Sequence, residues 1–287
     1  MVSNPEVLRE GFAVEDLMNP DRIVIGTSSV RPVSKMREVY APFAAPLIVT
    51  DTNSAELIKH AANSFLALKI SYINAISAIC EAAGANVLEV ANGMGMDERI
   101  GRRFLNAGIG FGGSCFPKDL SAFIKIAEQL GYDFRLLKEV QRINTDQMDR
   151  FFKKIQETLW VLKDKRLGVL GLAFKQNTDD VRTSPAVDLC HRLLREGARL
   201  RVHDPKAMEK ARAVLPPSDA VEYVDDPDEV SAGCDALVIA TEWPHFAKLD
   251  LARARRQMTT AILFDGRNLL DRAEAEAHGF LYRGVGR

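Results

Sequence analysis

The sequence predicts an α/β protein in which an α-helical central region is followed by a doubly wound parallel sheet. Residues 54–83 are apolar on nearly every side of a helix, which is typical of a helix buried in a core or between subunits. From Lys165 onward, short apolar runs alternate with amphipathic stretches, as the strands and helices of a parallel sheet do. The 287 residues, 47% hydrophobic and 27% charged, are enough for two domains with substantial cores.

Residues 1–50 are expected to form a strand, a helix and a second strand. Apolar runs at Arg22–Gly26 and Pro46–Thr50 flank a mixed stretch from Ser34 to Phe43. Residues 51–162 are expected to be helical, and Gly84 is a natural end for the long apolar helix. The helices of this region are predicted at Ser54–Ala83, Asn86–Gly93, Pro117–Leu130 and Leu136–Leu162.

Residues 163–287 are expected to form a Rossmann-like domain, and the change of pattern near Leu162 marks the boundary before it. Amphipathic stretches at Pro185–Glu196 and Ala207–Val214 predict two of its helices. Its strands are predicted at Leu167–Leu170, Leu200–Val202, Ala236–Ala240 and Ala261–Phe264.

Charge and cysteine usage exclude several classes of function. The 38 lysines and arginines nearly balance the 39 acidic residues, so no global field would attract nucleic acid or an anionic membrane. The four cysteines lie far apart and the five histidines are scattered, which predicts free thiols in a reducing compartment and no metal site. The chain starts with polar residues, and polar side chains interrupt the long apolar stretch. We therefore expect a cytoplasmic protein with no membrane partner.

Residues 108–119 read GIGFGGSCFPKD and match G-x-G-x-x-G at Gly108, Gly110 and Gly113. A dinucleotide-binding fingerprint also requires a hydrophobic strand before it, and residues 102–107 are not such a strand. The glycines are better explained by a backbone that passes close to a ligand and presents Cys115.

Cys115 is a candidate nucleophile. Pro117 suits the first turn of a helix, so Cys115 would lie just before the positive end of that helix, a position that favours the thiolate. Lys118 would add a nearby cation. The alternative is a small buried hydrophobe, and we favour that interpretation for Cys80, Cys190 and Cys234, which lie in apolar helices or strands.

Two pairs of polar residues have helical spacing. Lys59 and Asn63 share one face of the long apolar helix, where an amine and an amide could hold a developing oxyanion. Glu6 and Glu10 could serve as acid or base groups. From the residues alone, a lysine extended to solvent, an asparagine bonded to backbone and two surface glutamates remain the favoured interpretation.

Five ordered motifs resemble the UDP-glucose/GDP-mannose dehydrogenase family, in particular its UDP-glucose branch, over essentially the whole chain. These motifs are NPEVLREG (4–11), PDRIVIG (20–26), ELIKHAANSFLALKIS (56–71), GFGGSCFPKDL (110–120) and GLAFKQNTDDVRTSP (171–185). Further matches are ATEW (240–243) and FDGRN (264–268). The resemblance implies that residues 1–50 are a remnant of an NAD-binding domain, followed by a dimerisation region and a UDP-sugar-binding domain.

The resemblance implies two NAD-dependent oxidations that convert UDP-glucose to UDP-glucuronate through a thiohemiacetal and a thioester on a cysteine. That cysteine would be Cys115. Lys59 and Asn63 would stabilise the charged oxygen, Asp119 would help to orient water and the lysine, and Glu6 would act through a water. The resemblance thus reverses the interpretation of Lys59 and Glu6 that their spacing alone favours.

Further positions match residues that surround the ligands in this family. Arg99 matches a residue that reaches the substrate of the partner in a dimer. Those near the NAD are Glu10, Cys115, Lys118 and Arg182. Those around the UDP-sugar are Glu6, Leu8, Glu10, Lys59, Asn63, Arg99, Phe104, Asn106, Gly108, Gly112, Phe174, Lys175 and Arg267.

The chain departs from the family pattern in two ways. Val7 stands where the family usually has phenylalanine, and the glycine-rich phosphate-binding unit and a catalytic threonine are absent. We therefore expect a truncated chain that is inactive alone, with a non-catalytic UDP-sugar-binding module or a GDP-mannose dehydrogenase as alternatives. A homodimer is expected on residues 54–80, whose apolar residues are Ala61, Ala62, Phe65, Leu66, Ile70, Ile73, Ile76 and Ile79.

Overall fold

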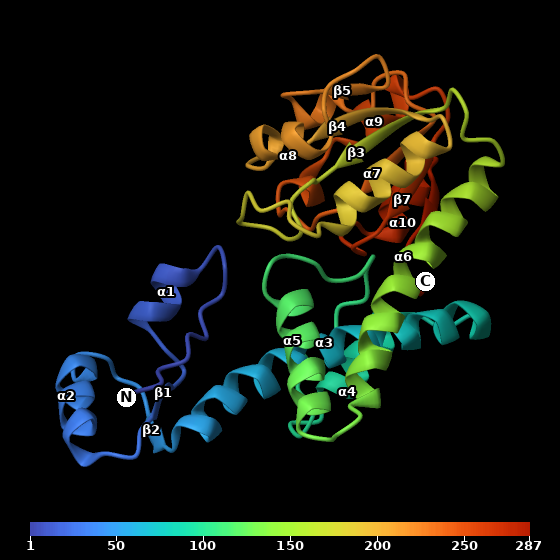
Figure 1. The fold of residues 1–287 in the computed structure, drawn as a ribbon. Coiled ribbons are helices and arrows are strands. Elements are labelled where there is room, and N and C mark those ends of the chain that lie inside the picture. The colour runs from blue at the N-terminus through green and yellow to red at the C-terminus, as the bar shows by residue number, and fades with distance from the viewer.

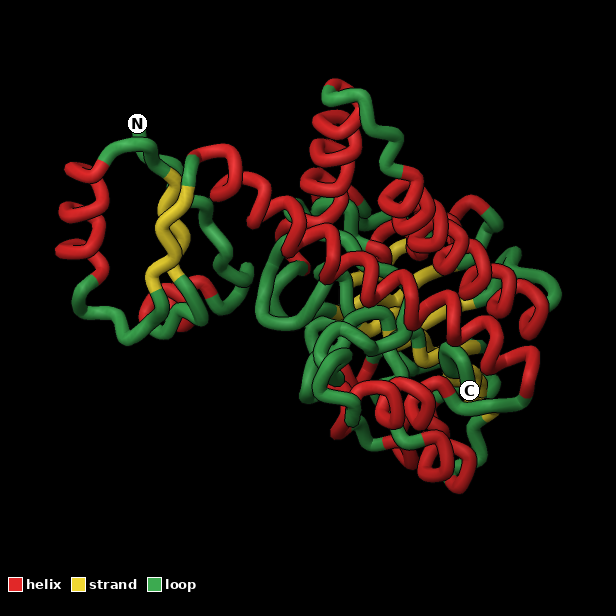
Figure 2. Tube along the Cα trace, turned by 90° about the horizontal axis from the view of Figure 1, so that it is seen from below, coloured by secondary structure: helices red, strands yellow, loops and turns green.

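A computed structural model describes all residues from 1 to 287 (Figure 1). Residues 1–50 form a small unit that stands to one side of the rest of the molecule and joins it through the start of α3 (Figure 2). In this unit β1 (Ile23–Gly26) pairs in parallel with β2 (Leu47–Thr50), and the strands are accompanied by α1 (Ala13–Met18) and α2 (Val30–Tyr40). The predicted strand, helix and strand are therefore present, and α1 is an element that the sequence did not predict.

The central region is helical and begins with α3 (Thr52–Ala83). Asp51 caps this helix by accepting a hydrogen bond from the Ser54 amide at 2.9 Å, and Gly84 ends it in a left-handed conformation, as predicted. The region also contains α4 (Val87–Gly95), α5 (Phe116–Gln129) and α6 (Arg135–Leu159). By length and composition α3 could cross a membrane, but in this fold it packs against α5, α6 and β1.

The C-terminal domain is a six-stranded parallel sheet in the order β5-β4-β3-β6-β7-β8. The strands are β3 (Arg166–Leu170), β4 (Arg199–His203), β5 (Val221–Tyr223), β6 (Ala236–Ile239), β7 (Ile262–Asp265) and β8 (Leu281–Arg283). The helices are α7 (Pro185–Arg195), α8 (Met208–Val214), α9 (Leu251–Gln257) and α10 (Arg272–Ala277), with short 3-10 turns at Pro227–Glu229 and Phe246–Lys248. The predicted doubly wound parallel sheet is confirmed.

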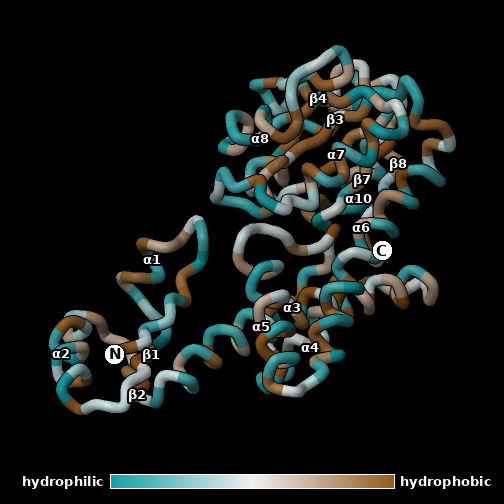
Figure 3. Tube along the Cα trace, viewed as in Figure 1, coloured by the Kyte–Doolittle hydropathy of each residue, from teal (hydrophilic) through white to brown (hydrophobic).

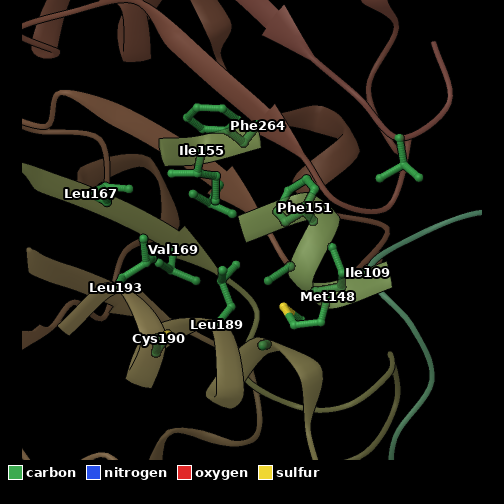
Figure 4. Close-up of a cluster of buried hydrophobic side chains, with 14 of the residues drawn as sticks. Ile109, Met148, Phe151, Ile155, Leu167, Val169, Leu189, Cys190, Leu193 and Phe264 are labelled. Atoms are coloured by element: carbon green, nitrogen blue, oxygen red, sulfur yellow. The ribbon is translucent and has the colours of Figure 1, made fainter. Parts of the chain in front are cut away.

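One continuous core joins the central helices to this sheet. The second half of α6 places Phe151 and Ile155 among β3, β7 and α7, with Ile109 beside them (Figure 4). Figure 3 shows hydrophobic residues along β3 inside a more polar shell. The packing therefore crosses the boundary that the sequence predicts near Leu162, although α6 ends and β3 begins on either side of it.

The last residues of the chain return to the central helices. The Gly286 carbonyl accepts a hydrogen bond from the Val87 amide at 2.9 Å, and its amide donates to Glu81 at 2.7 Å. Gly286 has a positive φ, and a Cβ there would lie 2.7 Å from side-chain atoms of Ser77 and Val87. Only glycine allows this close approach, which fastens the sheet domain to α3 and α4.

One residue expected on the free face of α3 lies inside the protein instead. Ile73 is completely buried in the continuous core, whereas Phe65, Tyr72 and Ile79 are exposed. The apolar surface of α3 is thus divided between a face that packs within the chain and a face that does not.

Candidate active site at the start of α5

Cys115 occupies the position before the first turn of α5 and is exposed, as predicted. Its carbonyl accepts the Asp119 amide at 2.8 Å, and Pro117 lies in the first turn, where it interrupts no helical hydrogen bond. The other three thiols are buried. Burial raises the pKa of Cys190 and of Cys234 to about 12, which keeps both thiols protonated.

Two polar residues of α3, Asn63 and Lys59, bind carboxylates. The Asn63 amide donates to Asp119 at 2.7 Å, and Asp119 is buried one turn after Cys115. The Lys59 ammonium donates to Glu6 at 3.0 Å. Asn63 and Asp119 therefore join α3 to the first turn of α5, one turn after Cys115, and Lys59 and Glu6 join α3 to the first residues of the chain.

The glycine loop, residues 108–114, lies against the loop that follows β3. A Cβ on Gly112 would lie 2.1 Å from the Thr183 carbonyl oxygen, and one on Gly113 would lie 2.6 Å from the Phe174 ring. No strand precedes this loop. The glycines allow close approach to the loop after β3, and the approach to a ligand stays a prediction. Without a strand directly before it, the loop does not form a dinucleotide fingerprint.

The carboxyl ends of β3, β6 and β7 open toward the glycine loop. β3 and β6 are the neighbouring strands at which the sheet reverses its order, the place where doubly wound folds bind ligands. Arg267, just after β7, donates to the carbonyls of Ala240 at 2.9 Å and Gly110 at 3.1 Å. It also pairs with Glu242 at 3.2 Å. Arg267 therefore ties the glycine loop to this edge of the sheet.

Lys175 places a cation near the thiol. Burial lowers its pKa from the ordinary value, while the charges of Glu10 and Cys115 act in the opposite direction. Its ammonium lies 5.5 Å from the centre of the Phe174 ring. Glu10 itself accepts a hydrogen bond from Thr178 at 2.9 Å, so the first residues of the chain bridge α3 and the loop after β3.

Other predicted site residues line the approach to this region or lie apart from it. Phe104 has a positive φ of 65° and its ring lies 6.4 Å from that of Phe116, next to Cys115. Asn106 accepts a hydrogen bond from Arg102 at 2.8 Å. The Leu8 amide donates to Glu6, and a Cβ on Gly108 would meet Gly266 and Arg267. The Lys118 ammonium lies 3.9 Å from the Asp119 carboxylate, and Arg182 forms an ion pair with Asp180. Arg99 is strongly exposed and pairs only with its neighbour Asp97.

Sequence reasoning missed the amide side chains that hold the glycine loop. Asn74 of α3 accepts the Gly108 amide at 2.9 Å, and Gln147 of α6 donates to the Gly108 carbonyl at 2.9 Å. Asn144 of α6 binds Phe111. All three are buried or half-buried polar residues, and the one available signal was Asn74, a polar residue within the long apolar helix.

The fold and the site together define a multi-part α/β protein that presents a cysteine to the ligand crevice of a doubly wound sheet. Three sequence models of one family match the chain in order. The NAD binding domain of the UDP-glucose/GDP-mannose dehydrogenase family matches residues 1–44, the central domain matches residues 53–146, and the UDP binding domain matches residues 168–272.

Individual relatives give the same result. A UDP-glucose 6-dehydrogenase of Bacillus subtilis is 45% identical over 100% of this chain and 62% of its own length. One of Rickettsia bellii is 42% identical over 100% of this chain and 67% of its own length. The solved UDP-glucose dehydrogenase of Pyrobaculum islandicum superposes with a TM-score of 0.88 at 44% identity and covers 99% of this chain and 63% of its own.

The chain therefore belongs to the UDP-glucose/GDP-mannose dehydrogenase family. It spans about two thirds of the length of the curated relatives that it matches.

Proposed function

We propose that this chain carries the catalytic cysteine and the UDP-sugar site of a UDP-glucose 6-dehydrogenase. The observation that supports this most directly is the hydrogen bond of Asn63 to Asp119, one turn after the exposed Cys115, with Lys59 one turn before Asn63 on the same helix. The identity of 41–46% to relatives named as this enzyme supports UDP-glucose over other nucleotide sugars.

In the proposed reaction the Cys115 thiol adds to the aldehyde formed from C6 of the sugar, and the sulfur–carbon bond of a thiohemiacetal forms as the carbonyl π bond breaks. Asn63 and Lys59 hold the oxygen that gains negative charge. After the second oxidation the resulting thioester is hydrolysed by water, with Glu6 and Asp119 positioned to orient that water and accept its proton.

The diphosphate of the substrate requires cations in the crevice. Lys175 and Arg267 are proposed to face it, together with backbone groups of the glycine loop. Arg267 already uses all three of its nitrogens on carbonyl oxygens, so Lys175 is the cation with more capacity to bind a phosphate.

The residues at the reacting end fit an NAD. Glu10, Lys118 and Arg182 would hold it, since Lys118 and Arg182 are exposed cations and Arg182 is within electrostatic range of Cys115. NAD, when bound, supplies the hydride acceptor for both oxidations. The link between β1 and α2, residues 27–29, contains no glycine, so it is not the glycine-rich turn that holds the phosphates of a dinucleotide.

We further propose that the chain acts as three parts, residues 1–50, 51–162 and 163–287, and that it dimerises through α3. Phe65, Tyr72 and Ile79 are spaced seven residues apart and exposed, which gives one apolar stripe along this helix. In such a dimer the exposed Arg99 is free to reach the site of the other subunit.

Calorimetric titration with UDP, combined with a dehydrogenase assay, tests the proposed function. We expect these 287 residues to bind UDP more tightly than citrate, with loss of binding in Lys175→Met. We expect no measurable NADH formation, because these residues include no such glycine-rich turn to hold the phosphates of NAD. Equal binding of citrate and UDP would contradict the proposal. UDP binding that survives without any reactivity of Cys115 toward the sugar aldehyde would instead favour a non-catalytic UDP-sugar-binding module.

A further inference from the structure

The glycine loop has no regular secondary structure, yet side chains from several elements bind its backbone. Asn74 and Gln147 hold the amide and carbonyl of Gly108. At the other end of the loop, Thr183 donates to the Gly113 carbonyl at 2.7 Å. A loop whose polar groups are bound by side chains from separate elements has one preferred path rather than an ensemble.

Asn144 of α6 makes the most restrictive of these contacts. Its Oδ1 accepts the Phe111 amide at 2.8 Å, and its Nδ2 donates to the Phe111 carbonyl at 3.0 Å. The two bonds fix both peptide groups of one residue, as a neighbouring β-strand would. Gly110 permits this, because it has a φ of 105° and a Cβ there would lie 2.9 Å from the Asn144 oxygen.

The constraint at Phe111 is transmitted to the start of α5. The Phe111 ring packs edge-on against the Phe116 ring at 5.8 Å, and both rings pack against a small core formed by Ala67, Leu120 and Val140. Phe116 directly follows Cys115 in the chain. Holding Phe111 therefore holds the backbone from which the thiol extends.

We propose that Asn144 is a positioning residue for Cys115, acting through Phe111 and not by contact with the substrate. This inference rests on the proposed function. Addition of a thiol to a carbonyl depends on the approach of two atoms, and a misplacement of about 1 Å can cost about a hundredfold in rate. Binding of the UDP part of the substrate depends far less on that geometry.

The C6 aldehyde of UDP-glucose is the probe that separates these two effects. The thiol adds to its carbonyl, the sulfur–carbon bond forms, and the thiol proton passes to the former carbonyl oxygen, so no oxidant is needed. The test compares the affinities of the aldehyde and of UDP, measured calorimetrically, for the natural chain, Asn144→Leu, Asn144→Asp and Thr145→Ala. Thr145 is the exposed neighbour on α6 and serves as the matched control.

We expect the natural chain and Thr145→Ala to bind the aldehyde more tightly than UDP, with the difference lost in Cys115→Ser. Asn144→Leu should lose about tenfold to a hundredfold of that advantage while its affinity for UDP changes less than about twofold. Asn144→Asp keeps the acceptor for the Phe111 amide and loses the donor to its carbonyl, so it should lose part of the advantage. If thermal melting shows that Asn144→Leu does not fold, the comparison is made with Asn144→Asp instead.

Full retention of the advantage in both Asn144 variants would overturn the positioning role and leave the proposed function intact. An equal loss of UDP affinity and aldehyde affinity would also overturn it, because that result indicates a general structural role. Absence of both UDP binding and aldehyde binding in the natural chain would overturn the proposed function itself.

Discussion

Among the four thiols, Cys115 is the one that the fold leaves open to reagents. With limiting iodoacetamide near pH 8, we expect Cys115 to be alkylated first. Burial raises the pKa values of Cys190 and Cys234 to about 12, so these two thiols should react at least about a hundredfold more slowly. Peptide mapping by mass spectrometry measures the order, with Cys115→Ser as the control. Earlier labelling of Cys190 or Cys234 would refute the assignment.

Lys175 gives the stability of the chain a defined pH dependence. Burial lowers its pKa in the folded state, so the unfolded chain binds more protons at this residue in the pH range between that lowered pKa and 10.5. The charged lysine therefore destabilises the fold at neutral pH, and this effect is relieved as pH rises through the lowered pKa. Urea unfolding of the natural chain and of Lys175→Met should give a stability difference that narrows as pH rises toward 10.5. A difference that is constant with pH would contradict this.

The sequence could place individual residues but not their partners. Pro117 and the glycines located Cys115 at the start of a helix, and helical spacing put Lys59 and Asn63 on one face. Their carboxylate partners, Glu6 and Asp119, lie 53 and 56 positions away in the chain, and no spacing rule predicts contacts at such distances. Hydrogen bonds between residues so far apart depend on the tertiary fold. The roles of Glu6 and Asp119 were therefore predicted from the family resemblance and not from spacing.

At the scale of elements, strong periodicity decided what could be predicted. The long helices α3 and α6 and the buried strands β3, β4, β6 and β7 were all predicted. β5 and β8 are only three residues long and occupy the two edges of the sheet, where burial is incomplete and the apolar pattern is weak. α9 and α10 are short and rich in charge, which made them resemble loops.

The exposed stripe of α3 predicts the oligomeric state. Sedimentation at tens of micromolar should show a dimer for the natural chain and a monomer for Ile79→Glu, because a charge would then be buried without a partner at the contact. Ile73 is unsuitable for this test, since its substitution would disrupt the core of the single chain. Lys125→Glu, at an exposed position on α5, is the matched control for added negative charge. A dimer that persists in Ile79→Glu would place the interface elsewhere.

At the scale of the whole molecule, Gly112 joins the central region to the sheet domain. In Gly112→Ala the new methyl group would lie 2.1 Å from the Thr183 carbonyl oxygen, a backbone atom that cannot rotate away. We expect a loss of about 1–3 kcal/mol in the free energy of unfolding, measured with urea, together with weaker UDP binding. Gly93→Ala is the control, because open space surrounds that position within α4. Equal stabilities of the two variants would show that the loop contact is not needed.

The course of α6 determines which parts of the molecule can move as units. Its first half packs against α3 and α5, and its second half lies in the core of the sheet domain, so both belong to one rigid body. Residues 1–50 are held to that body by β1 against α3 and by single polar contacts through Glu6 and Glu10. The reach of Glu6 to Lys59 and of Glu10 to Thr178 therefore depends on the packing of β1 against α3, because any displacement of residues 1–50 would move both carboxylates together.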